Sequence, residues 1–133
     1  MTAIVVDASA VVAMLTDPGA TGAWAVEQVQ GHALAAPHLV VFEAANVLRR
    51  MEIAGQLSSD HANLAYRDLC ALPVALWPYE AATARVWDLR HHVTAYDASY
   101  VALAELLETS LVTLDGRLAA THGLRCPVLV PST

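Results

Sequence analysis

The hydrophobic residues of this chain occur in two patterns, short continuous apolar runs and longer stretches with helical spacing. The continuous runs are flanked by turn-forming residues, which is typical of strands buried on both faces of a parallel sheet. Pro37 follows one run directly, and a strand interior does not tolerate proline, so that strand must stop there. The predicted strands cover residues 3–7, 32–36, 74–77, 110–114 and 127–130.

Helical spacing fills the intervals between these strands. Ser9 and Ser58 are expected to cap the first and fourth helices, because a serine hydroxyl accepts a hydrogen bond from a free N–H of the first turn. Gly31 and Gly55 are placed to end the second and third helices. The predicted helices cover residues 10–15, 20–30, 38–54, 59–71, 80–91, 96–108 and 116–121. Regular alternation of strands and helices predicts one domain, residues 1–133, an α/β/α sandwich whose mainly parallel sheet has about five strands.

Four carboxylates interrupt this hydrophobic pattern. Asp7 and Asp115 end predicted strands, and ligands of open α/β sheets bind at the carboxyl ends of strands. Glu43 lies among apolar residues of a helix, where an unpaired carboxylate would be costly. Asp97 opens a helix, a position that the helix dipole alone could explain. The other nine acidic residues are expected to be ordinary solvated charges on polar helix faces.

Several carboxylates in one partly dry pocket repel one another and are incompletely solvated. A bound divalent cation would remove that penalty. Oxygen ligands suit Mg²⁺ or Mn²⁺, whereas zinc prefers cysteine and histidine. The pattern therefore suggests a Mg²⁺ or Mn²⁺ enzyme that acts on phosphate esters.

Composition narrows the remaining possibilities. The hydrophobic fraction is 56% and the mean hydropathy is +0.45, above the usual value for soluble domains, so part of the apolar surface is expected to be an interface. Charged residues interrupt every long apolar stretch, so we predict no membrane span. The first basic residue is Arg49, which argues against a secretory signal and for the cytoplasm. Cys70 and Cys126 lack metal spacing and are expected to be free thiols.

The net charge of −6 argues against a broad basic surface for nucleic acid, but it leaves a small nuclease possible, since bound cations would neutralise some acids. All seven basic residues other than histidine are arginines. None of the six histidines shows metal spacing, so we assign none of them to catalysis. The three tryptophans, Trp24, Trp77 and Trp87, are expected to be core or interface anchors.

Four segments together resemble a PIN domain, in particular a VapC-type toxin ribonuclease. They are Val5-Val6-Asp7-Ala8-Ser9, the helix from Glu43 through Asn46-Val47-Leu48, Thr94-x-Tyr96-Asp97-Ala98-x-Tyr100, and Leu111-Val112-Thr113-Leu114-Asp115-x-Arg117-Leu118. Each motif is weak alone, but the four occur in the family's order over nearly the whole chain.

The resemblance implies a Mg²⁺- or Mn²⁺-dependent endoribonuclease that inhibits translation. Its metal-binding and catalytic residues would be Asp7, Glu43, Asp97 and Asp115. Metal-activated water would then attack the phosphodiester in line and leave 5′-phosphate and 3′-hydroxyl ends.

Four neighbouring residues have two interpretations each. Ser9 and Thr113 match family positions where a hydroxyl holds water or orients a carboxylate, or they serve only in capping and packing. Asn46 either fixes Glu43 or lies on the surface. Arg117 contacts RNA phosphate or, as the simpler expectation, forms an ion pair on the helix surface.

The resemblance also implies partners. We expect an RNA substrate, a VapB-type antitoxin and a homodimer that forms a heterotetramer or larger complex with the antitoxin. The antitoxin would wrap the first helices, with segments 11–15 and 24–26 in hydrophobic contact, and one of its arginines could enter the acidic pocket and displace metal.

Three other functions remain open at this point. A phosphoacceptor domain also gathers aspartates around Mg²⁺, but such domains use a lysine and this chain has none. A catalytically silent PIN domain would keep the fold only to bind RNA or a partner protein. A DNA or structure-specific nuclease of the same fold is the third, although the chain lacks additional basic segments.

Overall fold

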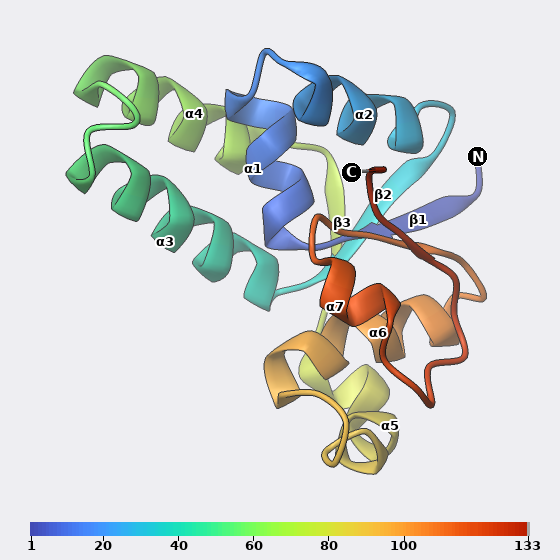
Figure 1. Ribbon diagram of the computed structural model, residues 1–133. Helices are drawn as coiled ribbons and strands as arrows, with labels where there is room; N and C mark the ends of the chain where they lie inside the picture. Colours follow the sequence, from blue (N-terminus) through green and yellow to red (C-terminus); the bar gives the residue numbers. More distant parts are fainter. Residues whose placement is uncertain (133) are drawn as a thin grey trace.

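A five-stranded parallel sheet forms the centre of the computed structural model, which describes residues 1–132 (Figure 1). Its strands are β1 (Ala3–Val6), β2 (Ala33–Pro37), β3 (Val74–Trp77), β4 (Leu111–Val112) and β5 (Val128–Leu129). They lie in the order β3-β2-β1-β4-β5, and every pair is parallel. The predicted α/β fold and strand number are confirmed.

The helices follow the predicted order with two changes. They are α1 (Ala8–Thr16), α2 (Ala20–Val29), α3 (Leu39–Ile53), α4 (Ser59–Ala71), the 3-10 helix η1 (Tyr79–Ala82), α5 (Thr83–Asp88), α6 (Ala95–Leu106) and α7 (Gly116–Ala119). The single helix predicted for residues 80–91 is wrong, because the backbone at Ala82 is not helical (φ −142°, ψ 24°) and separates η1 from α5. The predicted Ser9 cap is also wrong, because Asp7 caps α1.

Helices cover the sheet in two groups. Figure 1 shows α1 to α4 together on one side of the molecule and α5 and α6 on the other. Helix α6 packs on β1 and β2, while α1 contacts α2, α3 and α4. The core between these layers includes Val5, Val6, Leu111 and Val112 of the central strands, all fully buried. No helix in the described part of the chain is long and apolar enough to cross a membrane.

The pairing of β1 with β4 determines where a site can form. From β1 the chain proceeds outward through β2 and β3 on one side, and β4 and β5 lie on the other. The two strands are therefore at a topological switch point, where the connections diverge and leave a crevice at the carboxyl edge. The Asp7 N–H donates to the carbonyl oxygen of Val112 at 3.2 Å, which fixes the first residues after both strands side by side.

A partly buried ion pair attaches α5 to the rest of the domain. Arg85 Nε lies 2.6 Å from Glu105 Oε1, and Arg85 Nη2 also donates to the carbonyl oxygen of Gly123 at 2.7 Å. The Arg125 N–H donates to Glu105 Oε2 at 2.7 Å. The sequence-based assignment of Glu105 as a solvated charge is thus wrong: it links α5, α6 and the segment before β5. Cys70 and Cys126 are free, as predicted.

Candidate active site at the carboxyl edge of the sheet

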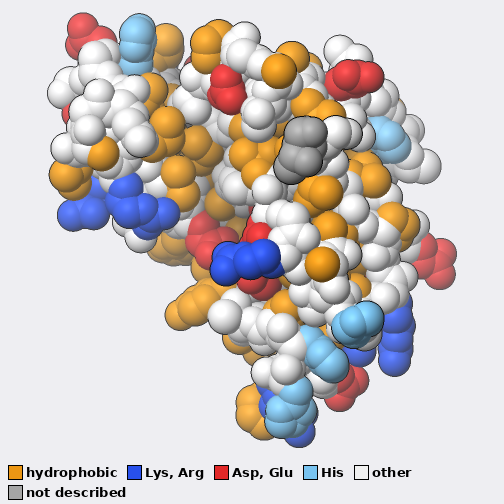
Figure 2. Space-filling view, viewed as in Figure 1, with side chains coloured by type: hydrophobic (Ala, Val, Ile, Leu, Met, Phe, Trp, Pro, Cys, Tyr) orange, Lys and Arg blue, Asp and Glu red, His pale blue; other side chains and the backbone are white. Residues whose placement is uncertain are grey.

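One cavity of about 290 Å³ is lined by all four of the carboxylates that the sequence singled out, Asp7, Glu43, Asp97 and Asp115. They come from four different segments: the end of β1, helix α3, the first turn of α6 and the start of α7. Ser9, Asn46, Arg50 and Tyr100 also line it. In Figure 2 red acidic side chains show near the middle of the surface, with blue arginine side chains beside them.

Asp7 is the most tightly held of the four. Its Oδ1 accepts hydrogen bonds from Ser9 Oγ at 2.6 Å and from the Ala10 N–H at 3.0 Å. Its Oδ2 accepts one from the hydroxyl of Thr113, a residue with no exposed surface. Ser9 Oγ in turn accepts the Leu114 N–H at 3.0 Å. This network joins the segments after β1 and β4 and fixes the orientation of the carboxylate.

Glu43 is held from across the cavity. Tyr100 Oη donates to Glu43 Oε1 at 2.5 Å, which connects α3 to α6. Tyr100 is 2% exposed, and burial together with Glu43 raises its pKa far above the usual value for tyrosine. The phenol therefore stays protonated and remains a hydrogen-bond donor to the carboxylate.

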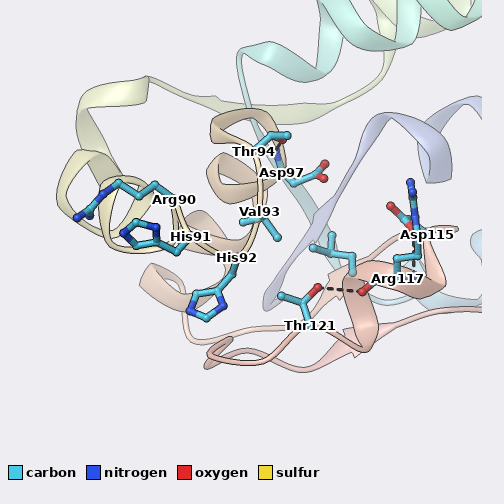
Figure 3. Close-up of a pocket in the computed structure, with 10 residues that line it drawn as sticks. Arg90, His91, His92, Val93, Thr94, Asp97, Asp115, Arg117 and Thr121 are labelled. Carbon is cyan, nitrogen blue, oxygen red and sulfur yellow. Dashed lines mark hydrogen bonds and ion pairs between the residues drawn. The ribbon is translucent and has the colours of Figure 1, made fainter.

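Asp97 and Asp115 are held less firmly. The hydroxyl of Thr94 caps α6 by accepting the Asp97 N–H at 3.2 Å, and no hydrogen bond to the Asp97 side chain is present in the described chain. Asp115 caps α7 by accepting the Arg117 N–H at 2.9 Å. Arg117 Nε also lies 3.4 Å from Asp115 Oδ1, with its side chain 95% exposed. Figure 3 shows Asp97 and Asp115 at the same opening.

Burial and crowding of negative charge disturb the ionisation of this site. Burial is the main cause that raises the pKa of Asp7, Glu43 and Asp97. Repulsion from Asp115 adds to the rise at Asp7 and Asp97. The hydrogen bonds to Asp7 and Glu43 favour the charged form but do not offset the desolvation. Arg117 lowers the pKa of Asp97, but burial and the neighbouring acids outweigh it.

The donor set fits a hard divalent cation. The ligands available around the cavity are carboxylate oxygens, which suit Mg²⁺ or Mn²⁺, and a cation would relieve the mutual repulsion. Among residues 1–132, no three acidic, histidine or cysteine side chains already meet at one metal-binding point. Glu43 accepts a hydrogen bond from Tyr100, and Asp115 accepts one from the Arg117 N–H at the start of α7.

The neighbouring residues differ in how they match the sequence-based interpretations. Ser9 and Thr113 both donate hydrogen bonds to Asp7. This agrees with the interpretation in which their hydroxyls orient a carboxylate. Asn46 lines the cavity, but no hydrogen bond joins it to Glu43 in the described residues. That role belongs to Tyr100, which the sequence analysis quoted only as part of a motif. Arg50 lies one helical turn after Asn46 on α3 and also lines the cavity. The sequence analysis missed it because an exposed arginine carries no local signal.

Comparison with known proteins identifies the family. The model of the PIN domain matches residues 4–124. The chain belongs to the PIN-domain family. VapC ribonuclease Mb0985 of Mycobacterium bovis is 40% identical to this PIN domain over 127 residues, which are 96% of this chain and 97% of the relative. Ribonuclease VapC12 of Mycobacterium tuberculosis is 42% identical over 122 residues, 90% of this chain and 92% of the relative.

Solved structures show the same fold at lower identity. VapC20 of Mycobacterium tuberculosis, described as a Sarcin-Ricin loop cleaving toxin, has a TM-score of 0.66 and 18% identity over 91% of this PIN domain and 95% of that chain. VapBC2 of Rickettsia felis was solved bound to a DNA fragment from its promoter. It has a TM-score of 0.67 and 12% identity, over 96% of this PIN domain and 98% of that chain. These likenesses support the architecture alone.

The raised carboxyl pKa values predict how the stability of the metal-free PIN domain depends on pH. The folded state holds these protons more tightly than the unfolded chain, whose carboxyls titrate near ~4. Stability should therefore fall as pH rises from ~4 through the raised values. Asp7→Asn removes one such charge while keeping an acceptor for the α1 cap. In EDTA, its Tm advantage over wild type should be larger at pH 8 than at pH 5; an equal difference at both would contradict this account.

Proposed function

We propose that this PIN domain is the Mg²⁺- or Mn²⁺-dependent endoribonuclease toxin of a toxin-antitoxin module, acting in the cytoplasm to inhibit translation. One observation carries the proposal: four carboxylates from four separate segments line a single cavity at the switch point of the sheet. Relatives of 40% identity over nearly the full length are named ribonucleases, which supports RNA as the substrate. Hydrolysis would leave 5′-phosphate and 3′-hydroxyl ends.

The carboxylates would hold the cation from several directions. Asp7 is already oriented by three donors and Glu43 by one, so both are fixed before substrate arrives. Asp97 and Asp115 face the same opening and complete the ligand set. When bound, Mg²⁺ or Mn²⁺ acidifies water and stabilises the negative charge that develops on the phosphate.

A catalytically silent PIN module that binds RNA or a protein is the second candidate. The observation in its favour is that no three ligands converge within the described residues. The two candidates differ in one measurable property, since only the first requires cleavage that depends on metal and on the four acids.

Asp97→Asn should reduce cleavage of RNA at least about a hundredfold, because it removes a negative ligand whose charge the cation requires. The measurement is Mg²⁺- and Mn²⁺-dependent cleavage of total cellular RNA by antitoxin-free protein, stopped by EDTA. Asp88→Asn, an exposed aspartate on α5, is the matched control and should cut like wild type. If the wild type does not cut, or Asp97→Asn cuts equally, the ribonuclease proposal fails.

Tyr100→Phe should weaken Mg²⁺ binding and activity about tenfold, because Glu43 loses the donor that orients it. The Mg²⁺ concentration for half-maximal cleavage should rise, and excess Mg²⁺ should restore part of the rate. Tyr96→Phe is the control on the same helix, since Tyr96 is exposed and makes no side-chain hydrogen bond in the described structure. Equal Mg²⁺ dependence in both variants would show that the Tyr100 hydroxyl has only a packing role.

The antitoxin is proposed to wrap the first helices, α1 and α2, as part of a complex in which two copies of the PIN domain associate. Within the proposed contact segment 11–15, Val11, Val12 and Ala13 are buried in the core, so Met14 and Leu15 are the residues left to contact the antitoxin. These two line a cavity of about 340 Å³ with Leu57 and Leu64. In segment 24–26, Ala25 is buried and Val26 is exposed.

Leu15→Ala and Trp24→Ala should each weaken antitoxin binding about tenfold or more, because each deletes apolar contact area. Calorimetry with a candidate cognate VapB-type antitoxin measures the affinity, and thermal melting checks that each variant folds. Leu106→Ala on α6, an exposed leucine away from this surface, is the control. If both variants fold and bind like wild type, this surface is not the antitoxin site.

A further inference from the structure

A second, larger cavity of about 530 Å³ adjoins the acidic one. The two share Asp97 and Asp115, and the outer wall of the second is lined by Arg90, His91 and His92 of the loop between α5 and α6 together with residues around α7 (Figure 3). We call residues 89–94 the basic loop. In a chain of net charge −6, this loop and the neighbouring Arg117 place basic groups beside the acids.

The basic loop has a fixed backbone. Leu89 is 1% exposed and anchors the loop in the core. Its carbonyl oxygen accepts the N–H groups of His92 at 2.9 Å and Val93 at 3.1 Å. The side chains of Arg90, His91 and His92 are exposed on this support. Groups presented on a rigid support lose less conformational freedom when a ligand binds.

Trp87 adds an aromatic surface to the basic loop. It is 67% exposed, so the core alternative of the expected core or interface anchor is wrong, and the interface alternative stays a prediction. The guanidinium carbon of Arg90 lies 4.6 Å from the centre of its ring, and Arg90 Nη1 donates to the Trp87 carbonyl oxygen at 2.9 Å. Within residues 1–132 the other N–H groups of this guanidinium make no hydrogen bond, so they can donate to a ligand. An exposed tryptophan next to arginine is the combination that binds single-stranded nucleic acid, by base stacking and phosphate contact.

We propose that Trp87 and the basic loop bind the RNA strand beside the phosphodiester that is cut. Arg90 and the two histidines would contact phosphates, and a base would stack on Trp87. Arg117 would lie at the end of this surface nearest the acids. The inference rests on the proposed function, and it extends that function by naming residues that position the substrate. Arg90, His91 and His92 line the same cavity as Asp97 and Asp115, and Trp87 adjoins it through its contact with Arg90. This continuity favours RNA over a protein partner.

The test is the double variant Trp87→Ala/Arg90→Ala. Binding is measured by fluorescence anisotropy with a labelled single-stranded RNA of about ten nucleotides, in the Asp7→Asn background so that the probe stays intact. Asp7 does not line the second cavity. We expect the Kd to rise about tenfold or more and the slope of log K against log salt to become shallower by about 0.7.

The matched control is Tyr66→Ala/Arg67→Ala, which removes one exposed aromatic residue and one exposed arginine from α4. It should leave the Kd and its salt dependence unchanged. Thermal melting checks that both double variants fold. If the loop variant melts early, His91→Ala/His92→Ala replaces it, because both side chains are exposed and the same loss of RNA binding is expected.

Cleavage of total cellular RNA by the same variants, with Asp7 restored, separates the two proposals. The loop variant should lose activity mainly through a higher KM, while the control cuts like wild type. If the wild type cuts RNA but the loop variant keeps its KM and Kd, this inference is overturned, the ribonuclease proposal stands, and a protein partner becomes the better occupant. If the wild type does not cut, the proposed function fails, and the anisotropy alone decides whether the loop binds RNA.

Discussion

The parallel pairing of β1 with β4 is the constraint on which the rest of the site depends. It sets Asp7 beside Thr113 and brings the starts of α1 and α7 to one edge. Each helix start uses an aspartate of the site as its cap, so folding and site assembly share the same side chains. Asp7 and Asp115 are consequently placed by the strand ends and helix starts, while helices α3 and α6 place Glu43 and Asp97.

Burying several carboxylates close together has a cost in free energy, which falls on the residues around the cavity. Three of the carboxyls have raised pKa values because they are buried near other negative charges. Hydroxyl donors from Ser9, Thr113 and Tyr100 offset part of the desolvation. The remaining imbalance favours the binding of positive charge in this pocket.

The sequence predicted the sheet and its acids well, since buried strands and carboxylates at strand ends are local patterns. It was less successful where partners are remote or alternatives are close in energy. Tyr100 meets Glu43 across 57 positions, and no local pattern reveals that pair. Both Asp7 and Ser9 are good helix caps, and only the β1–β4 geometry decides between them. The break between η1 and α5 at Ala82 and the exposure of Trp87 were likewise not visible in the helical spacing.

The basic loop and the sheet edge are built from separate parts of the chain. Of the loop residues, Leu89 is buried and Val93 half-buried, while the others are exposed, and α5 is attached to the domain through the Arg85–Glu105 ion pair. Substitutions at residues 90–92 therefore leave core packing and the acidic residues intact. Among related chains, this separation would allow the loop to diverge rapidly under selection for new RNA targets while the chemistry at the sheet edge is inherited unchanged.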